Sequence, residues 1–70
     1  MIQFQIRISC TKGNTHFNHD ILEREDANHK ERKIAQHMER IVRQALVTSA
    51  EAVGGTYKLE HITQPTGDQQ

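Results

Sequence analysis

A long helical segment in the second half of the chain most restricts what this sequence can fold into. Apolar or small residues recur there at spacings of three and four, namely Ile34, Met38, Ile41, Ala45, Ser49 and Ala52, which is the periodicity of a helix with one apolar side. Asn28 followed by Glu31 fits a capping box, and Gly54-Gly55 is typical of a helix end. The sequence therefore predicts a helix over His29–Val53, roughly 37 Å long at about 1.5 Å per residue.

The segments on either side of this helix alternate as strands do. In residues 2–10 the apolar positions are Ile2, Phe4, Ile6, Ile8 and Cys10, and this alternation predicts a strand with one buried face. A turn is predicted at residues 11–14, where Gly13-Asn14 is the signal. Residues 15–19 then alternate more weakly and predict a second strand, for which a polar loop is the alternative. Residues 56–63 predict a third strand, which Pro65 ends.

We therefore expect one small α+β domain over residues 1–64, in the order strand, strand, helix, strand, followed by a flexible polar tail over residues 65–70. The expected sheet is three-stranded, antiparallel and ordered 2-1-3, with the amphipathic helix covering it. A right-handed crossover that skips one position sets the third strand beside the first. This order places the most apolar strand in the centre, where burial is greatest.

The composition predicts a thin core that needs support from a partner. Only 34% of the 70 residues are hydrophobic, and a chain near this length buries only about 60% of its unfolded surface. Cys10 is the only cysteine, so no disulfide can form within one chain, and the lone thiol without a signal peptide indicates the cytoplasm. Because small domains of this kind usually need a staple or a partner, we expect a homodimer.

The apolar arc of the predicted helix is wider than one surface requires, because Val42, Leu46 and Val53 extend it. One interpretation is that the whole arc packs on the sheet and its edges. The alternative is that one flank, formed by Leu46 and Val53, meets a second copy of the chain. Under that alternative these two residues mediate self-association.

The charges cancel in number but are segregated along the chain. Nine basic and nine acidic residues give a net charge of zero. The helix side opposite the apolar arc has no acid and is formed by Lys33, Gln36, His37, Arg40, Arg43 and Gln44. It is interpreted either as a solvated face or as a surface where Lys33, His37, Arg40 and Arg43 bind an acidic protein partner. Nucleic acid is a further alternative, although zero net charge and the lack of interleaved aromatic residues oppose it.

Little in the sequence favours catalysis, a cofactor or a metal. His16 and His19 form a His-x-x-His pair near Cys10, but residues three apart on a strand point to opposite faces. Cys10 is expected to face inward on a central strand, where a thiol is inert. No apolar stretch approaches the roughly 20 residues that span a bilayer. We expect a protein that is not an enzyme, has no metal or cofactor and does not bind membranes.

The alternation of residues 1–8 resembles the opening strand of ribbon-helix-helix repressors. In that family the outward polar residues of a paired strand contact the major groove, and here they are Gln3, Gln5 and Arg7. The resemblance implies nucleic-acid binding by these residues. The rest of the chain departs from the family, which has two helices after the strand. In size and mixed polarity the chain is also similar to accessory proteins of bacteriophages, and a small regulator or inhibitor that binds a protein is the expected function.

Overall fold

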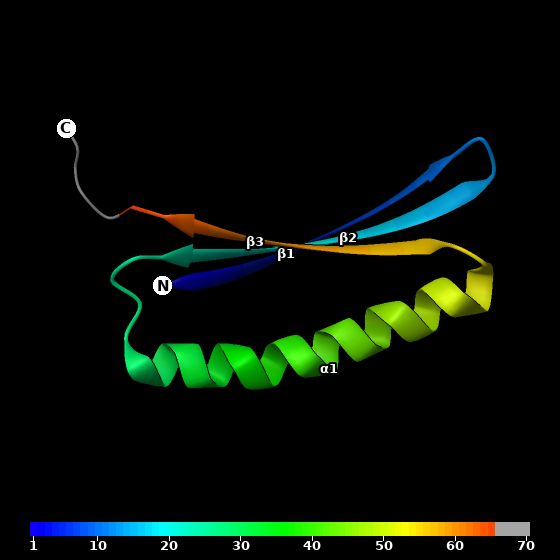
Figure 1. Ribbon diagram of the computed structural model, residues 1–70. Coiled ribbons are helices and arrows are strands. Elements are labelled where there is room, and N and C mark those ends of the chain that lie inside the picture. The colour runs from blue at the N-terminus through cyan, green and yellow to red at the C-terminus, as the bar shows by residue number, and fades with distance from the viewer. Residues whose placement is uncertain (66–70) are drawn as a thin grey trace.

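The computed structural model describes residues 1–65 of the chain. Within them the elements follow in the order β1 (Ile2–Thr11), β2 (Asn14–Arg24), α1 (His29–Val53) and β3 (Thr56–Gln64). Figure 1 shows this α+β fold, in which α1 runs along one face of the three-stranded sheet formed by these residues. The predicted order of elements and the bounds of the helix are confirmed. Most of the predicted tail, residues 66–70, lies outside the described residues.

The predicted sheet order 2-1-3 and the all-antiparallel pairing are wrong. The observed order is β1-β2-β3, so that β2 is central. β1 pairs with β2 in antiparallel fashion, whereas β3 pairs with β2 in parallel, from His16 opposite Thr56 to Arg24 opposite Gln64. The hairpin turn lies at residues 11–14, as predicted, but the residues with positive φ are Lys12 and Gly13 and not Gly13 and Asn14.

The length of α1 explains the level at which β3 begins. The 25 residues of α1 span roughly 37 Å, and the 11 residues of β2 span roughly 36 Å as an extended strand. The helix therefore returns the chain from the end of β2 to the level of its beginning. β3 then starts beside His16 on the open edge of β2, without skipping a position.

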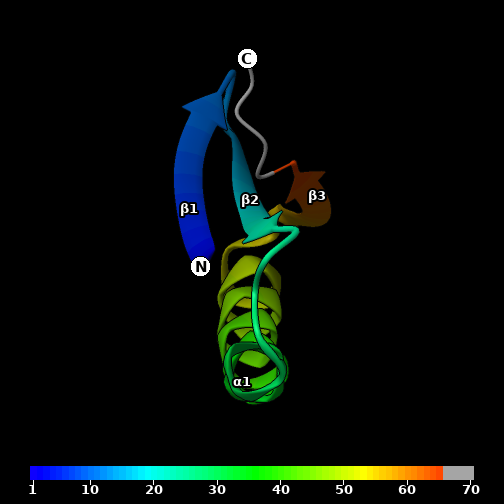
Figure 2. The same cartoon turned by 90° about the vertical axis from the view of Figure 1, so that its left-hand side faces the viewer.

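The central position belongs to a strand whose apolar pattern is weak in the sequence. On the helix side of β2, Phe17, His19 and Ile21 are buried, and Asp20 is buried on the other side. The polar residues His19 and Asp20 obscure the alternation, which is why the prediction ended at residue 19. β1, expected to be central, forms one edge of the sheet (Figure 2) and is largely exposed.

Both ends of α1 are fixed by the local groups that the sequence predicts. The Asn28 side chain accepts a hydrogen bond from the backbone N–H of Glu31 at 2.8 Å, and the Glu31 carboxylate accepts one from the backbone N–H of Asn28 at 2.9 Å. At the other end Gly54 adopts the left-handed conformation, with φ of 67°. Gly55 passes so close to β2 that a Cβ atom there would lie 2.5 Å from the carbonyl oxygen of Thr15.

Only one side of the predicted apolar arc packs against the sheet. The core cluster consists of Phe17, Leu46 and Ala50, with Val42 and Tyr57 partly buried beside it. The predicted inward stripe at Ile34, Met38 and Ile41 is exposed instead. Because α1 lies below β2 (Figure 2), its contact face is the side that meets Phe17 and Tyr57, and the neighbouring side is left uncovered.

Candidate functional site

Five large apolar side chains from two elements are exposed on the surface. They are Ile6 and Ile8 of β1 and Ile34, Met38 and Ile41 of α1, which are 44–64% exposed. We call these five residues the apolar surface. An exposed apolar patch built from several large side chains is typical of an interaction site.

The two halves of this apolar surface face the same space. Ile6 and Ile8 lie opposite His19 and Phe17 in the β1–β2 register, and cross-strand partners share one face of the sheet, which here is the face covered by α1. Between the halves lies a cavity of about 330 Å³, lined by Phe4 and Ile2 of β1 and by Ile34 and Met38 of α1. The strand and the helix therefore form a concavity at Ile34 and Met38, whereas Ile6, Ile8 and Ile41 are not part of its lining.

The two residues predicted for self-association lie in different environments. Leu46 is 8% exposed and belongs to the core cluster, so its side chain offers little area to a second copy. Val53 is 59% exposed at the last position of α1. Self-association itself stays a prediction.

The predicted basic face lies on the exposed side of α1. Lys33, His37, Arg40 and Arg43 are all exposed. Among the described residues, Lys33, His37 and Arg40 form no ion pair or side-chain hydrogen bond, whereas Arg43 Nε lies 3.4 Å from Glu39 Oε2. At about 100° per residue, positions 33, 37 and 40 point away from the positions that meet the sheet. The outer side of the helix therefore presents positive charge that no neighbouring acid neutralises.

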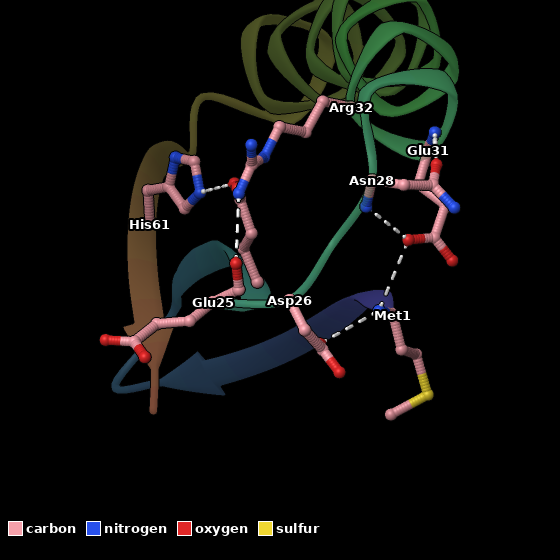
Figure 3. Close-up of polar contacts among 8 residues, drawn as sticks. Met1, Glu25, Asp26, Asn28, Glu31, Arg32 and His61 are labelled. Atoms are coloured by element: carbon pink, nitrogen blue, oxygen red, sulfur yellow. Dashed lines mark hydrogen bonds and ion pairs between the residues drawn. The ribbon is translucent and has the colours of Figure 1, made fainter. Parts of the chain in front are cut away.

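A charged cluster joins β2, α1 and β3 near the start of the helix. Arg32 Nε donates to Glu23 Oε2 at 2.8 Å, and His61 Nε2 lies 2.9 Å from Glu23 Oε1 (Figure 3). The hydrogen bond from Arg32, aided by His61, holds the pKa of Glu23 below its usual range. These groups line a cavity of about 430 Å³ between the helix and the sheet, but each is already paired with another. The cluster therefore links β2, α1 and β3 through these side-chain contacts.

Three polar side chains have buried atoms without partners between α1 and the sheet. Both ring nitrogens of His19, Oε2 of Glu39 and the hydroxyl of Tyr57 are buried without a hydrogen-bond partner in the described residues. Burial lowers the pKa of His19, while the charges of Glu39 and Asp20 act in the opposite direction. Burial, followed by the charge of Glu39, raises the pKa of Tyr57. This group was not predicted from the sequence, although His19 occupies the inward position between Phe17 and Ile21.

The strand residues of the nucleic-acid alternative lie on the far side of the sheet from α1. Gln3, Gln5 and Arg7 are exposed there. Arg7 Nη2 donates to Asp20 Oδ2 at 2.8 Å across the β1–β2 pair. This ion pair neutralises the only cation of the three, which reduces its attraction for a phosphate.

The residues considered for a metal do not converge. His16 hydrogen-bonds to Thr56 at 2.9 Å, while the neighbouring candidate His19 is buried under the helix, on the opposite face of β2. The burial predicted for Cys10 is wrong: the thiol is exposed, because β1 is an edge strand and not the central one. In the described part of the chain, no three His, Cys, Asp or Glu residues are grouped for a metal ion.

No helix within residues 1–65 is both long and apolar enough to cross a membrane. Comparison with protein-family models, with curated proteins and with solved structures finds no match to the chain.

Proposed function

We propose that this chain is a small non-catalytic interaction module that regulates or inhibits a protein by binding an acidic surface through Lys33, His37, Arg40 and Arg43. The observation that supports this most is the lack of any ion pair for Lys33, His37 and Arg40 in the described residues, although all three are exposed. The other arginines of the described chain, Arg7, Arg24, Arg32 and Arg43, each lie within 4.0 Å of an acid.

The helix is a suitable platform for such a contact. Lys33 and Arg40 are seven residues apart, or about 10 Å along the axis, and His37 lies between them. Because the capping box and Gly54 fix the two ends of α1, these side chains keep their spacing when a partner arrives. Complementary charge speeds the encounter and selects the partner more than it adds affinity.

The experiment compares proteins captured from cell extract by the immobilised wild-type chain and by two double variants with equal net charge. Lys33→Glu with Arg40→Glu changes the basic face. Lys12→Glu with Lys58→Glu changes exposed lysines of the hairpin turn and of β3, and serves as the control. We expect a captured protein to be retained by the control and lost by the first variant, and its affinity, measured with the purified protein, to fall at least about tenfold, or 1.4 kcal/mol.

Circular dichroism on both variants tests that folding is intact, since exposed substitutions usually change stability by under about 0.5 kcal/mol. Equal loss of capture by both variants would show only general charge attraction. Retention by both variants would exclude the basic face as the binding site.

Nucleic acid is the second candidate, favoured by the same unpaired cations. Repeating the capture after nuclease treatment separates the two, because a protein retained only through bound nucleic acid is then lost. A second experiment titrates the chain directly with labelled DNA and RNA and measures the affinity at several salt concentrations. If phosphates are bound, the logarithm of the affinity falls linearly with that of the salt concentration, with a slope of about 0.7 to 0.9 per contact.

A further inference from the structure

We infer that the apolar surface is covered by a second copy of this chain, joined to the first through the free edge of β1 in a two-fold symmetric dimer. The two sheets then form one six-stranded sheet with β1 and its symmetry mate at the centre. Both copies of α1 lie on the same face, with their exposed apolar sides toward each other. The contact uses a different side of α1 from the basic face, so it stands independently of the proposed function.

The first argument is the shortage of buried apolar side chains in the single chain. Among the described residues the buried hydrophobic set is only Phe17, Ile21, Ala27, Leu46 and Ala50. Two of these five are alanines, while the larger residues Ile34, Met38 and Ile41 remain about half exposed. Because about half of each of these side chains is in contact with water, covering them removes further apolar area from water and supplies stabilisation that the isolated fold lacks.

The second argument is the state of the β1 edge. β1 pairs only with β2, and its register runs without a bulge from Ile2 opposite Glu23 to Thr11 opposite Asn14. Its outer row of backbone groups is therefore open along ten residues. The strand has no proline, and its one charged residue, Arg7, is paired with Asp20 on the far face. Long, apolar, unblocked edges of this kind are templates for another strand.

The third argument is that β1 complements itself. In an antiparallel pair centred on Ile6, that residue meets its own symmetry mate and Phe4 lies opposite Ile8 of the second copy. Apolar side chains then face apolar side chains on the helix side along the whole strand, because the alternation is unbroken. On the far side Arg7 lies opposite Gln5, so no like charges are opposed. A two-fold contact requires this self-complementarity.

The available area is also sufficient. The exposed parts of the five residues of the apolar surface, together with the 51% exposed Met1, amount to about 500 Å² per chain, so that two copies reach the roughly 1,000 Å² expected of a specific interface. Pairing of the β1 backbones adds to this area. Both chains already present the surface, so no rearrangement is needed.

Sedimentation velocity across micromolar to submillimolar concentrations tests the dimer directly. We expect a dimer for the wild-type chain and a dissociation constant raised at least about tenfold by Ile6→Lys, which sets two like charges opposite each other. Ile62→Lys is the control, because Ile62 of β3 is also an exposed apolar residue, at 38%, but lies outside the apolar surface; its dissociation constant should stay within about threefold of the wild-type value. A wild-type monomer at every concentration overturns the proposal, as does equal weakening by the two variants.

A cross-linking experiment tests the register and does not depend on the fold tolerating a charge. In the chain with Ile6→Cys and Cys10→Ser, the two thiols meet at the symmetry axis with Cα atoms about 4.5–5.5 Å apart, a separation that a disulfide accommodates. In the wild-type chain Cys10 lies opposite Ile2, about 27 Å from its own mate. Mild oxidation should cross-link the variant and not the wild-type chain. A dimer that cross-links through Cys10, or not at all in the variant, overturns pairing through β1.

Discussion

The ring of Phe4 in β1 stands edge-on to the ring of His19 in β2, with centroids 5.2 Å apart and an interplanar angle of 62°. His19 is 0% exposed and both of its ring nitrogens lack a hydrogen-bond partner in the described residues. An imidazolium at this site would lose its hydration without gaining an acceptor. Burial therefore lowers the pKa of His19, against the opposing charges of Glu39 and Asp20.

The first prediction concerns stability against pH. Because burial holds the folded-state pKa of His19 below the ordinary value of 6.5, the unfolded chain binds more protons than the folded chain between these two values. The contribution of neutral His19 is complete above 6.5 and is lost as the pH falls through this window toward the folded-state pKa. Urea denaturation between about pH 7.5 and 5 should show a falling free energy of unfolding.

Two variants test whether His19 causes this fall. His19→Leu should flatten the dependence, since the group that must stay neutral is gone. His37→Gln, which removes an exposed histidine of α1, should leave the wild-type dependence in place. If the slope for His19→Leu equals that of the wild-type chain, another group is responsible.

The second prediction compares the contributions to stability of Leu46 and Val53, the two residues first expected to mediate self-association. Leu46→Ala should lower the free energy of unfolding by about 2–4 kcal/mol, because it removes a side chain from the core cluster around Phe17. Val53→Ala should cost less than about 0.5 kcal/mol, since Val53 is exposed at the end of α1. Thermal and urea unfolding of both variants measure the difference. Similar losses would contradict the observed phase of the helix.

The third prediction concerns Glu39, a carboxylate on the sheet-facing side of α1. Glu39→Leu should raise the free energy of unfolding by about 1 kcal/mol, because Oε2 of Glu39 is buried without a hydrogen bond, which costs about 1–3 kcal/mol. The ion pair with Arg43 that is lost is worth under about 0.5 kcal/mol. Glu39→Gln, which keeps the shape and a polar end, should gain less. A destabilised Glu39→Leu variant would show that Glu39 has a favourable contact at this site.

The fourth prediction tests how closely the backbone of Gly55, just after the end of α1, approaches β2. In Gly55→Ala the new Cβ atom would lie 2.5 Å from the Thr15 carbonyl oxygen, so the backbone must shift, and we expect a loss of about 2 kcal/mol or more. Gly54→Ala is the comparison, because it introduces only left-handed strain, with nothing within 4 Å of its Cβ, and should cost about 1 kcal/mol. A smaller loss for Gly55→Ala than for Gly54→Ala would contradict this reason.

The sequence by itself determined the features that depend on neighbouring residues. Asn28 and Glu31 start α1, and Gly54 ends it, because caps satisfy backbone groups within one turn. The alternation of β1 and β3 likewise follows from each strand having two different faces. The exposed positions of Lys33, His37, Arg40 and Arg43 could also be predicted, since charged side chains on one helix side stay in water.

Only the tertiary structure decided which apolar residues are buried. The sequence shows a wide apolar arc but not which part of it meets Phe17 and Tyr57, and the packing selected Leu46 and Ala50 instead of Ile34 and Met38. The place of β1 at the edge was equally invisible, because a strand that follows the helix can pair with the open edge of either β1 or β2, and only long-range packing decides between them. That long-range geometry leaves Ile6 and Ile8 exposed beside α1 and thereby creates the apolar surface.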